Sequence, residues 1–150
     1  MSVWKPSVTV AAVIERAGRF LLVEEVANGR RVLNQPAGHL EPEESLVAAC
    51  AREVMEETAH RFAPEALVGI YRWHYPETDV TFLRFAFRGR VEGVLPERAL
   101  DAEIVALHWL SRAELAERAA THRSPLVMRC VDDFLAGGHF PLAILSKDFS

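Results

Sequence analysis

The first part of the chain alternates short apolar runs with turn residues. Residues 8–14 are apolar on both faces and rich in β-branched side chains, which is typical of a strand buried on both sides. A turn containing Gly18 leads to a second apolar run at 19–25, and an Asn-Gly pair at 28–29 precedes a short strand at 31–33. The pattern therefore predicts three short strands before any helix.

A helix is predicted after a loop at 34–42 that is rich in proline and glycine. Pro42 followed by two glutamates suits a helix start, so we expect the helix to cover residues 44–58. Its apolar positions are Val47, Cys50, Ala51, Val54 and Thr58. This spacing places them on one side of the helix, which should lie on a sheet.

The second half predicts a hairpin followed by a strand and two helices. Residues 67–75 and 80–91 read as strands joined by a turn at 76–79, and side-chain alternation puts Arg84 and Arg88 on the face opposite Phe85 and Phe87. A strand at 104–110 precedes helices that end near 120 and at 135, the first capped by Ser111. One helix inserted among strands favours an α/β fold with a mixed sheet flanked by helices.

Composition narrows the function. The 150 residues fit one domain, 1–150, and 17 Lys and Arg against 21 Asp and Glu give a net charge of −4 with no basic block, which argues against a nucleic-acid polymer as partner. No apolar stretch is long enough to span a membrane, and the first residues lack the apolar core of a signal peptide, so we expect a cytoplasmic location. Cys50 and Cys130 are expected to be buried thiols.

Three glutamates of the predicted helix should present their carboxylates on one side. Glu56 and Glu57 follow Glu53 by three and four positions, an arc of about 100°. The charges repel each other, and Arg52 is the basic residue close enough to offset them. Mg²⁺ or Mn²⁺ would suit such oxygen ligands, with a loop carbonyl, Gly38 first, completing the site. From spacing alone, a solvated acidic helix face remains the alternative.

A longer pattern surrounds these residues. Gly38, five residues, Glu44, seven residues and then Arg-Glu-Val-x-Glu-Glu at 52–57 closely match a known box. The chain thus resembles the Nudix hydrolase superfamily, which implies an α/β/α sandwich and hydrolysis of a phosphoanhydride by water, releasing phosphate or pyrophosphate. The segments 34–41 and 82–85 resemble more narrowly the NudJ-type bacterial phosphatases. That branch is associated with thiamine diphosphate, its pyrimidine diphosphate precursor and nucleoside di- and triphosphates.

The resemblance implies roles for the residues of the box. Glu53, Glu56 and Glu57 would hold the metal, and Arg52 would orient Glu53 through a salt bridge. Glu44 would orient its neighbours or contact the metal from an outer position. The general base would be Glu53 or Glu103, which precedes the strand at 104–110, and Asp101 is a weaker candidate of the same kind.

A small-molecule diphosphate needs cationic side chains that bind its phosphates and flat side chains that stack on its ring. Arg84 and Arg72 interrupt apolar or aromatic strands and are the candidate phosphate contacts. Trp73, His74 and Tyr75 are candidates for stacking on a ring, and Gln35 and His39 for hydrogen bonds. The assembly is expected to be a monomer or a homodimer. A non-catalytic Nudix-like sensor of a nucleotide derivative is the alternative from another class.

The box departs from the family pattern at its end. The family continues with glycine and an aliphatic residue, where this chain has Ala59 and His60. A glycine there would end the helix in the left-handed region, so Ala59 either accepts a cost of roughly 1 kcal/mol or lets the helix end differently. We expect the change to affect helix termination more than the metal ligands, which lie upstream.

Overall fold

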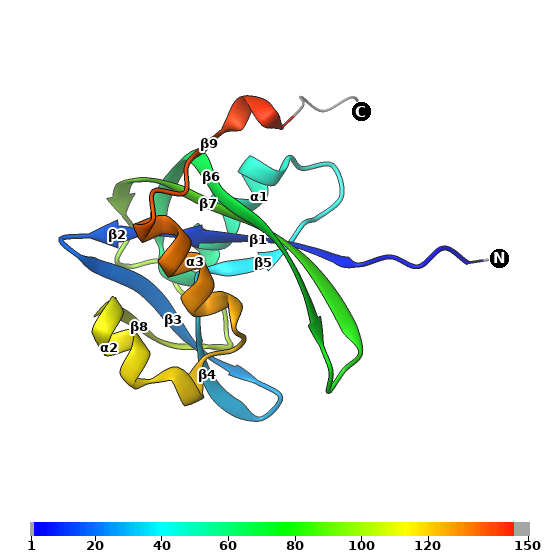
Figure 1. Ribbon diagram of the computed structural model, residues 1–150. Helices are drawn as coiled ribbons and strands as arrows, with labels where there is room; N and C mark the ends of the chain where they lie inside the picture. Colours follow the sequence, from blue (N-terminus) through cyan, green and yellow to red (C-terminus); the bar gives the residue numbers. More distant parts are fainter. Residues whose placement is uncertain (1, 146–150) are drawn as a thin grey trace.

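The computed structural model describes residues 2–145, which form strands and helices that cover the sheets (Figure 1). The strands are β1 (Ser7–Val13), β2 (Glu15–Arg16), β3 (Arg19–Ala27), β4 (Arg30–Asn34), β5 (Ala37–His39), β6 (His60–Tyr75), β7 (Val80–Val94), β8 (Ile104–Ser111) and β9 (Phe140–Pro141). The α-helices are α1 (Leu46–Thr58), α2 (Arg112–Glu117) and α3 (Leu126–Leu135), with short 3₁₀ turns at Ala119–Thr121 and Leu142–Ile144.

The strands form two sheets. The larger sheet has the order β5-β1-β7-β6-β9, in which β1 and β7 run parallel and the other neighbours run antiparallel. In the smaller sheet β3 pairs with β2, β4 and β8. The predicted mixed sheet and the predicted β6–β7 hairpin are therefore both confirmed.

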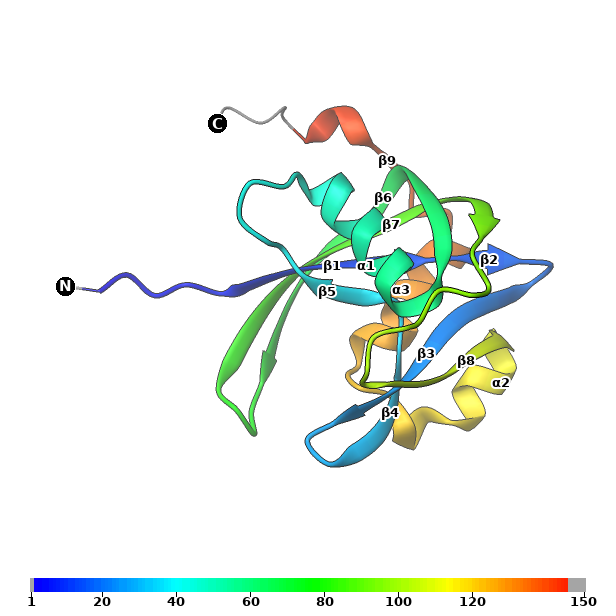
Figure 2. The ribbon, with the colours of Figure 1, turned by 180° about the vertical axis from the view of Figure 1, so that it is seen from behind.

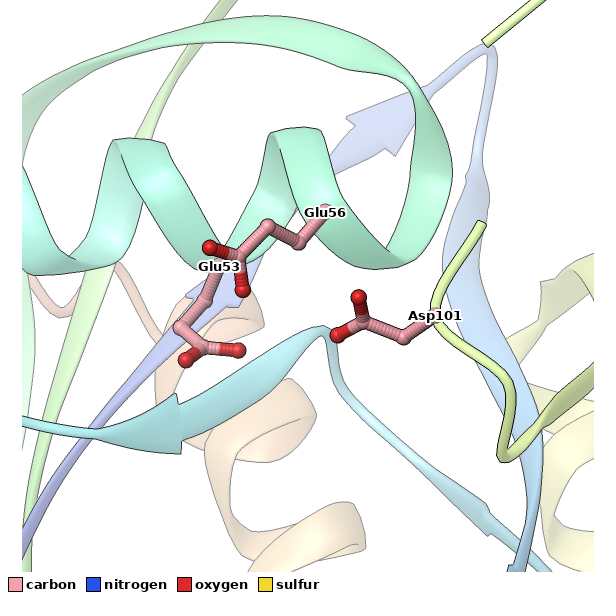
Figure 3. A group of neighbouring side chains, drawn as sticks. All are labelled: Glu53, Glu56 and Asp101. Carbon is pink, nitrogen blue, oxygen red and sulfur yellow. The ribbon is translucent and has the colours of Figure 1, made fainter. Parts of the chain in front are cut away.

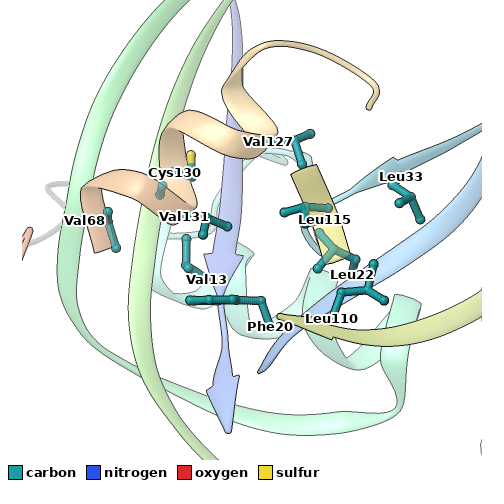
Figure 4. Close-up of a cluster of buried hydrophobic side chains, with 11 residues drawn as sticks. Val13, Phe20, Leu22, Leu33, Val68, Leu110, Leu115, Val127, Cys130 and Val131 are labelled. Atoms are coloured by element: carbon teal, nitrogen blue, oxygen red, sulfur yellow. The ribbon is translucent and has the colours of Figure 1, made fainter. Parts of the chain in front are cut away.

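Helices α1 and α3 cover opposite faces of the larger sheet (Figures 1 and 2). Side-chain alternation on β1 explains why both faces are apolar: Val10 and Ala12 pack in the cluster with α1, whereas Val13 packs in the cluster with α3. Figure 4 shows the second cluster, in which Val127 and Val131 of α3 face the strands. The two cores fix the helices on either side of the sheet.

Several predicted boundaries were wrong for local reasons. Helix α1 begins at Leu46 rather than 44, because Glu43 has a left-handed φ of 65° and Ser45 is the N-cap, its hydroxyl accepting the Ala48 N–H at 3.0 Å. Strand β6 begins at His60 rather than 67, and register shifts on either side of Pro64 let the strand continue past the proline. Helix α2 ends at Glu117 rather than near 120.

At the end of α1, Ala59 adopts the strained left-handed conformation, the first of the two outcomes expected from the sequence. Ala59 has a left-handed φ of 56°, and its N–H donates to the Met55 carbonyl at 2.9 Å. The helix therefore ends in the conformation that a glycine would adopt, although the residue is an alanine.

Cys50 and Cys130 are buried free thiols, as predicted. Within residues 2–145, none of the helices has the length and apolar character needed to cross a bilayer.

Candidate active site

A cleft of about 600 Å³ lies between the sheets, α1 and the loops before β8 and α3. Its acidic lining residues are Glu25, Glu41, Glu53, Glu57, Asp101 and Glu103, and it is also lined by His39, Trp73, Phe82, Arg84 and Arg123. Carboxylate, cationic and aromatic side chains therefore all face the same cleft. This arrangement brings together residues from most of the length of the chain.

Three carboxylates form what we call the acidic wall: Glu53, Glu56 and Asp101. Each offers one oxygen, and these oxygens lie within 4.8 Å of one another. Figure 3 shows Glu53 and Glu56 projecting from α1 toward Asp101 on the facing loop. The loop is tied to the helix because the Asp101 N–H donates to the Glu56 carbonyl at 3.0 Å. All the donor atoms are hard oxygens, which fits a divalent cation of the Mg²⁺ or Mn²⁺ type.

Gly38 has no side chain because the Glu53 carboxylate occupies the adjacent space. A β-carbon built on Gly38 would overlap the carboxylate carbon and both oxygens of Glu53. Any larger residue would therefore push Glu53 out of the acidic wall. Burial raises the pKa of Glu53, opposed by the ion pair with Arg52, and the neighbouring Glu56 and Asp101 raise it further.

Glu57 is turned toward the strand side of the helix. Its carboxylate accepts the Ala37 N–H at 2.9 Å, and the residue is 5% exposed. Burial raises its pKa to about 9, opposed by the Ala37 N–H, and Glu25, Glu53 and Asp101 add to the rise. A divalent cation nearby would favour the ionised form that this environment disfavours.

Arg52 is the positive centre of the acidic wall. Its guanidinium donates to both oxygens of Glu44 at 2.7 and 2.9 Å, and to Glu53 at 2.7 Å. It also donates to Glu56 at 3.3 Å and to the His39 carbonyl at 3.0 Å. The hydrogen bond from Arg52 lowers the pKa of the Glu44 carboxyl below its usual value. Arg52 therefore fixes the carboxylates but shares one charge among several of them.

Arg84, on β7, also lines the cleft. The residue is 6% exposed, and its guanidinium donates to the side-chain oxygens of Asn34 and Gln35, both at 3.0 Å. Trp73 and Phe82 stack beside it, with ring centroids 6.1 Å apart and planes 16° apart. A cationic group and a flat apolar surface are thus presented to the same space.

Comparisons with known proteins agree with this geometry. The family model described as the NUDIX domain matches residues 4–130. The chain belongs to the Nudix family. Phosphatase NudJ of Escherichia coli K12 is 40% identical over 147 residues, which cover 98% of this chain and 94% of that protein. The same values hold for Phosphatase NudJ of Shigella flexneri.

A solved Nudix hydrolase from Nitrosomonas europaea is 52% identical and superimposes with a TM-score of 0.94, covering 96% of this chain and 98% of that one. A MutT Nudix hydrolase from Burkholderia pseudomallei, 19% identical with a TM-score of 0.74 over 87% of this chain and 98% of its own, shares the fold. This chain is accordingly a Nudix hydrolase similar to the NudJ phosphatases.

The structure brings some of the predicted Nudix site residues together and separates others. Glu53, Glu57, His39, Trp73, Arg84 and Glu103 line the cleft. Arg72 is exposed and does not line it, because it alternates with Trp73 along β6 and so points to the other face. Tyr75 stacks on Trp73 at 5.2 Å, and it lines only a small neighbouring depression.

Two residues that the sequence predicted as contacts to the substrate or the metal instead bond to arginines of the site. Gln35 is 1% exposed and bonds to Arg84 rather than lining the cleft. Glu44 bonds through both oxygens to Arg52 and lies outside the acidic wall, which supports the orienting role over the metal contact.

Sequence reasoning underrated Asp101 and missed an ion pair at the cleft. Asp101 joins the wall across 45 positions of sequence, so helical spacing could not reveal it. Glu25 is 5% exposed on β3 and pairs with Arg123 at 2.7 Å, and both line the cleft. The available signal was a pair of adjacent acids, Glu24 and Glu25, within an apolar run of the strand, since a buried carboxylate needs a partner.

Proposed function

We propose that this Nudix hydrolase is metal-dependent and cleaves a phosphoanhydride bond in a nucleoside or thiamine-type di- or triphosphate, releasing phosphate or pyrophosphate. The observation that carries the proposal is that Glu53 and Asp101 of the acidic wall line the same cleft as the buried Arg84. An anionic diphosphate needs positive charge around its oxygens. A cation held by the carboxylates would supply part of it, and Arg84 would supply the rest.

Glu53, Glu56 and Glu57 are the proposed holders of Mg²⁺ or Mn²⁺, and the position of Asp101 adds it to this set. A bound divalent ion supplies charge neutralisation on the phosphate oxygens and lowers the pKa of water. Gly38 serves this site by leaving room for Glu53, and a contact from its carbonyl stays part of the proposal.

The chain's own residues would bind and orient the reactants. Arg84 would pair with a phosphate oxygen, Arg52 would hold Glu53 in place, and Glu44 would hold Arg52. The proton of the attacking water would go to Glu53 or to Glu103. Both candidates line the cleft, and Glu103 is fixed by its carbonyl, which accepts the Val26 N–H at 3.1 Å.

The organic group would stack against the Trp73 and Phe82 rings. Their faces suit any flat heterocycle, so this surface supports both a nucleobase and a thiamine-type pyrimidine. His39 lies beside Phe82, with ring centroids 6.5 Å apart, and could donate to the bound ring or to a phosphate.

The test is a release assay over a panel of nucleoside and thiamine-type di- and triphosphates, with Mg²⁺, with Mn²⁺ and with a chelator. We expect phosphate or pyrophosphate release that requires the cation and is strongest for a subset of the panel. Release of phosphate or pyrophosphate in the presence of the chelator would show that hydrolysis does not need a metal. No release from any compound with either cation would overturn the proposed function.

A further inference from the structure

Arg84 is a buried cation without an acidic partner. Its guanidinium donates to two neutral amides and to the Cys130 sulfur at 3.8 Å, and the ion pairs formed among residues 2–145 do not include it. A buried charge without a counter-charge is costly unless hydrogen bonds or a bound ligand compensate it. The guanidinium lines the cleft, so the missing counter-charge can reach it from there.

The other two arginines of the site, Arg123 and Arg52, differ from Arg84 because they have acidic partners. Arg123 pairs with Glu25 at 2.7 Å, and Arg52 is shared among Glu44, Glu53 and Glu56. Their charge is already offset by protein carboxylates. Arg84 is therefore the cleft-lining arginine, among the described residues, whose positive charge is still available to an anion.

The two amides that hold Arg84 are themselves held at their other ends. The Gln35 amide nitrogen donates to the Val127 carbonyl at 2.7 Å, and the Asn34 nitrogen lies 3.5 Å from Glu25. Each amide thus presents its oxygen to Arg84 and its nitrogen to an acceptor. Val127 is a fully buried residue of α3 in the core cluster of Figure 4, so Gln35 is anchored to a packed part of the protein.

An amide and a carboxylate of the same length would differ in their effect on Arg84. Either could accept its N–H groups, but a carboxylate would neutralise the charge and compete with a phosphate for the same donors. We propose that Gln35 and Asn34 are positioning residues, which aim the Arg84 guanidinium at the cleft while leaving its charge free for a diphosphate. This inference rests on the proposed function, because it specifies how that site binds its anionic substrate.

The experiment compares Gln35→Glu with Gln35→Met. Both variants lose the donor to the Val127 carbonyl, and the two side chains have similar length, but only Gln35→Glu places a negative charge next to Arg84. Met also loses the oxygen that Arg84 binds. A residue that served the fold alone would make the two variants alike, or make Met the worse of them.

Two readouts are taken from wild type and both variants. Calorimetry measures the affinity for inorganic pyrophosphate in the presence of Mg²⁺, and steady-state kinetics measures KM and kcat for whichever diphosphate wild type hydrolyses. Gln35→Glu is expected to weaken pyrophosphate binding and raise KM by at least about tenfold, with kcat much less affected. Gln35→Met is expected to show a clearly smaller rise in KM.

Equal pyrophosphate affinities for the two variants would overturn the inference, even if wild type hydrolyses diphosphates normally. Wild type that binds no pyrophosphate would overturn it as well. Wild type that binds pyrophosphate but hydrolyses nothing would count against the proposed function alone, since the binding comparison still decides the role of Gln35. If Gln35→Glu does not fold, Asn34→Asp, compared with Asn34→Leu, puts the same question to the second amide.

Discussion

The two sides of the cleft hold their charge in opposite ways. On the acidic wall, Glu53, Glu56 and Asp101 crowd together, and a single arginine is divided among several carboxylates. At the part of the cleft that we call the arginine floor, Arg84 is held by the neutral amides of Asn34 and Gln35. The acidic wall lacks the positive charge that would balance its carboxylates, and the arginine floor lacks the negative charge that would balance Arg84.

This difference teaches that neither side is electrostatically complete without a ligand. Burial, and after it the neighbouring carboxylates, raise the pKa of Glu53 and Asp101, and burial without a counter-ion makes Arg84 costly. A metal-bound diphosphate carries a cation for the wall and phosphate oxygens for the floor. The account can therefore be broken by changing the charge of one side at a time.

The largest effect is expected from Glu56→Gln on the wall. The substitution keeps the shape but removes one anionic oxygen from the group of three, so cation-dependent turnover should fall at least about 100-fold. Circular dichroism should show the fold unchanged. Glu117→Gln, an exposed change on α2, is the matched control and should keep wild-type turnover. Near-normal turnover of Glu56→Gln would mean that the wall does not hold the metal.

The next largest effect is expected from Arg84→Met on the floor. Loss of a charged contact to a phosphate should raise KM about tenfold to 100-fold, with a smaller change in kcat. Arg90→Met, an exposed position on the same strand, should leave both constants unchanged. If Arg84→Met lowered kcat and left KM alone, the floor would act on the chemistry rather than on binding.

A smaller effect, on stability, concerns Glu57, which lies beside the acidic wall and should distinguish the metal-free from the metal-bound protein. Burial raises the pKa of Glu57 from 4.5 to about 9, so the folded protein keeps a proton that the unfolded chain releases. This group therefore stabilises the metal-free fold at low pH, and its contribution is lost as pH rises from about 4.5 to about 9. Thermal melts in chelator should drop by a few degrees across that range.

Mg²⁺ should reverse this loss at high pH, because the cation takes over the role of the proton. Glu57→Gln should melt with a flatter pH profile in chelator, while Glu117→Gln keeps the wild-type profile. A wild-type profile in the Glu57→Gln variant would show that another group is responsible.

The smallest effect concerns the end of the helix that carries the wall. Ala59→Gly should raise the free energy of unfolding by up to about 1 kcal/mol, because glycine adopts the left-handed φ of 56° without strain. The gain is limited because the buried methyl group is lost. Chemical denaturation measures it, and turnover should stay the same. A loss of stability would indicate that packing of the methyl outweighs the backbone strain.

The same two regions show what a sequence can and cannot predict. The spacing of Glu53 and Glu56 and the neighbouring Arg52 follow from helical geometry, so most of the wall could be predicted. Asp101 joined it only through a tertiary contact between its loop and α1. The floor combines β7, the segment before β5 and α3, and the sequence alone pointed to Gln35 as a substrate contact rather than as the support of Arg84.

The fold shows a similar division. The longer strands, the hairpin and the mixed sheet were predictable from alternation and turns, because each depends on local pattern. The short strands β2 and β5 were not, since they lie in segments whose composition indicated a turn and a loop, and five strands rather than three therefore precede α1. The early start of β6 was not, since a proline usually ends a strand and only the register shifts around Pro64 accommodate it. The start of α1 depended on the Ser45 cap rather than on Pro42.

A crystal structure with Mn²⁺ and the methylene-bridged analogue of a nucleoside diphosphate would test the shared use of both sides most directly. The account predicts anomalous density for Mn²⁺ beside Glu53 and Glu56, and a phosphate oxygen within hydrogen-bonding distance of the Arg84 guanidinium. Mn²⁺ bound away from the acidic wall, or an analogue that reaches the metal but leaves Arg84 without a phosphate contact, would contradict it.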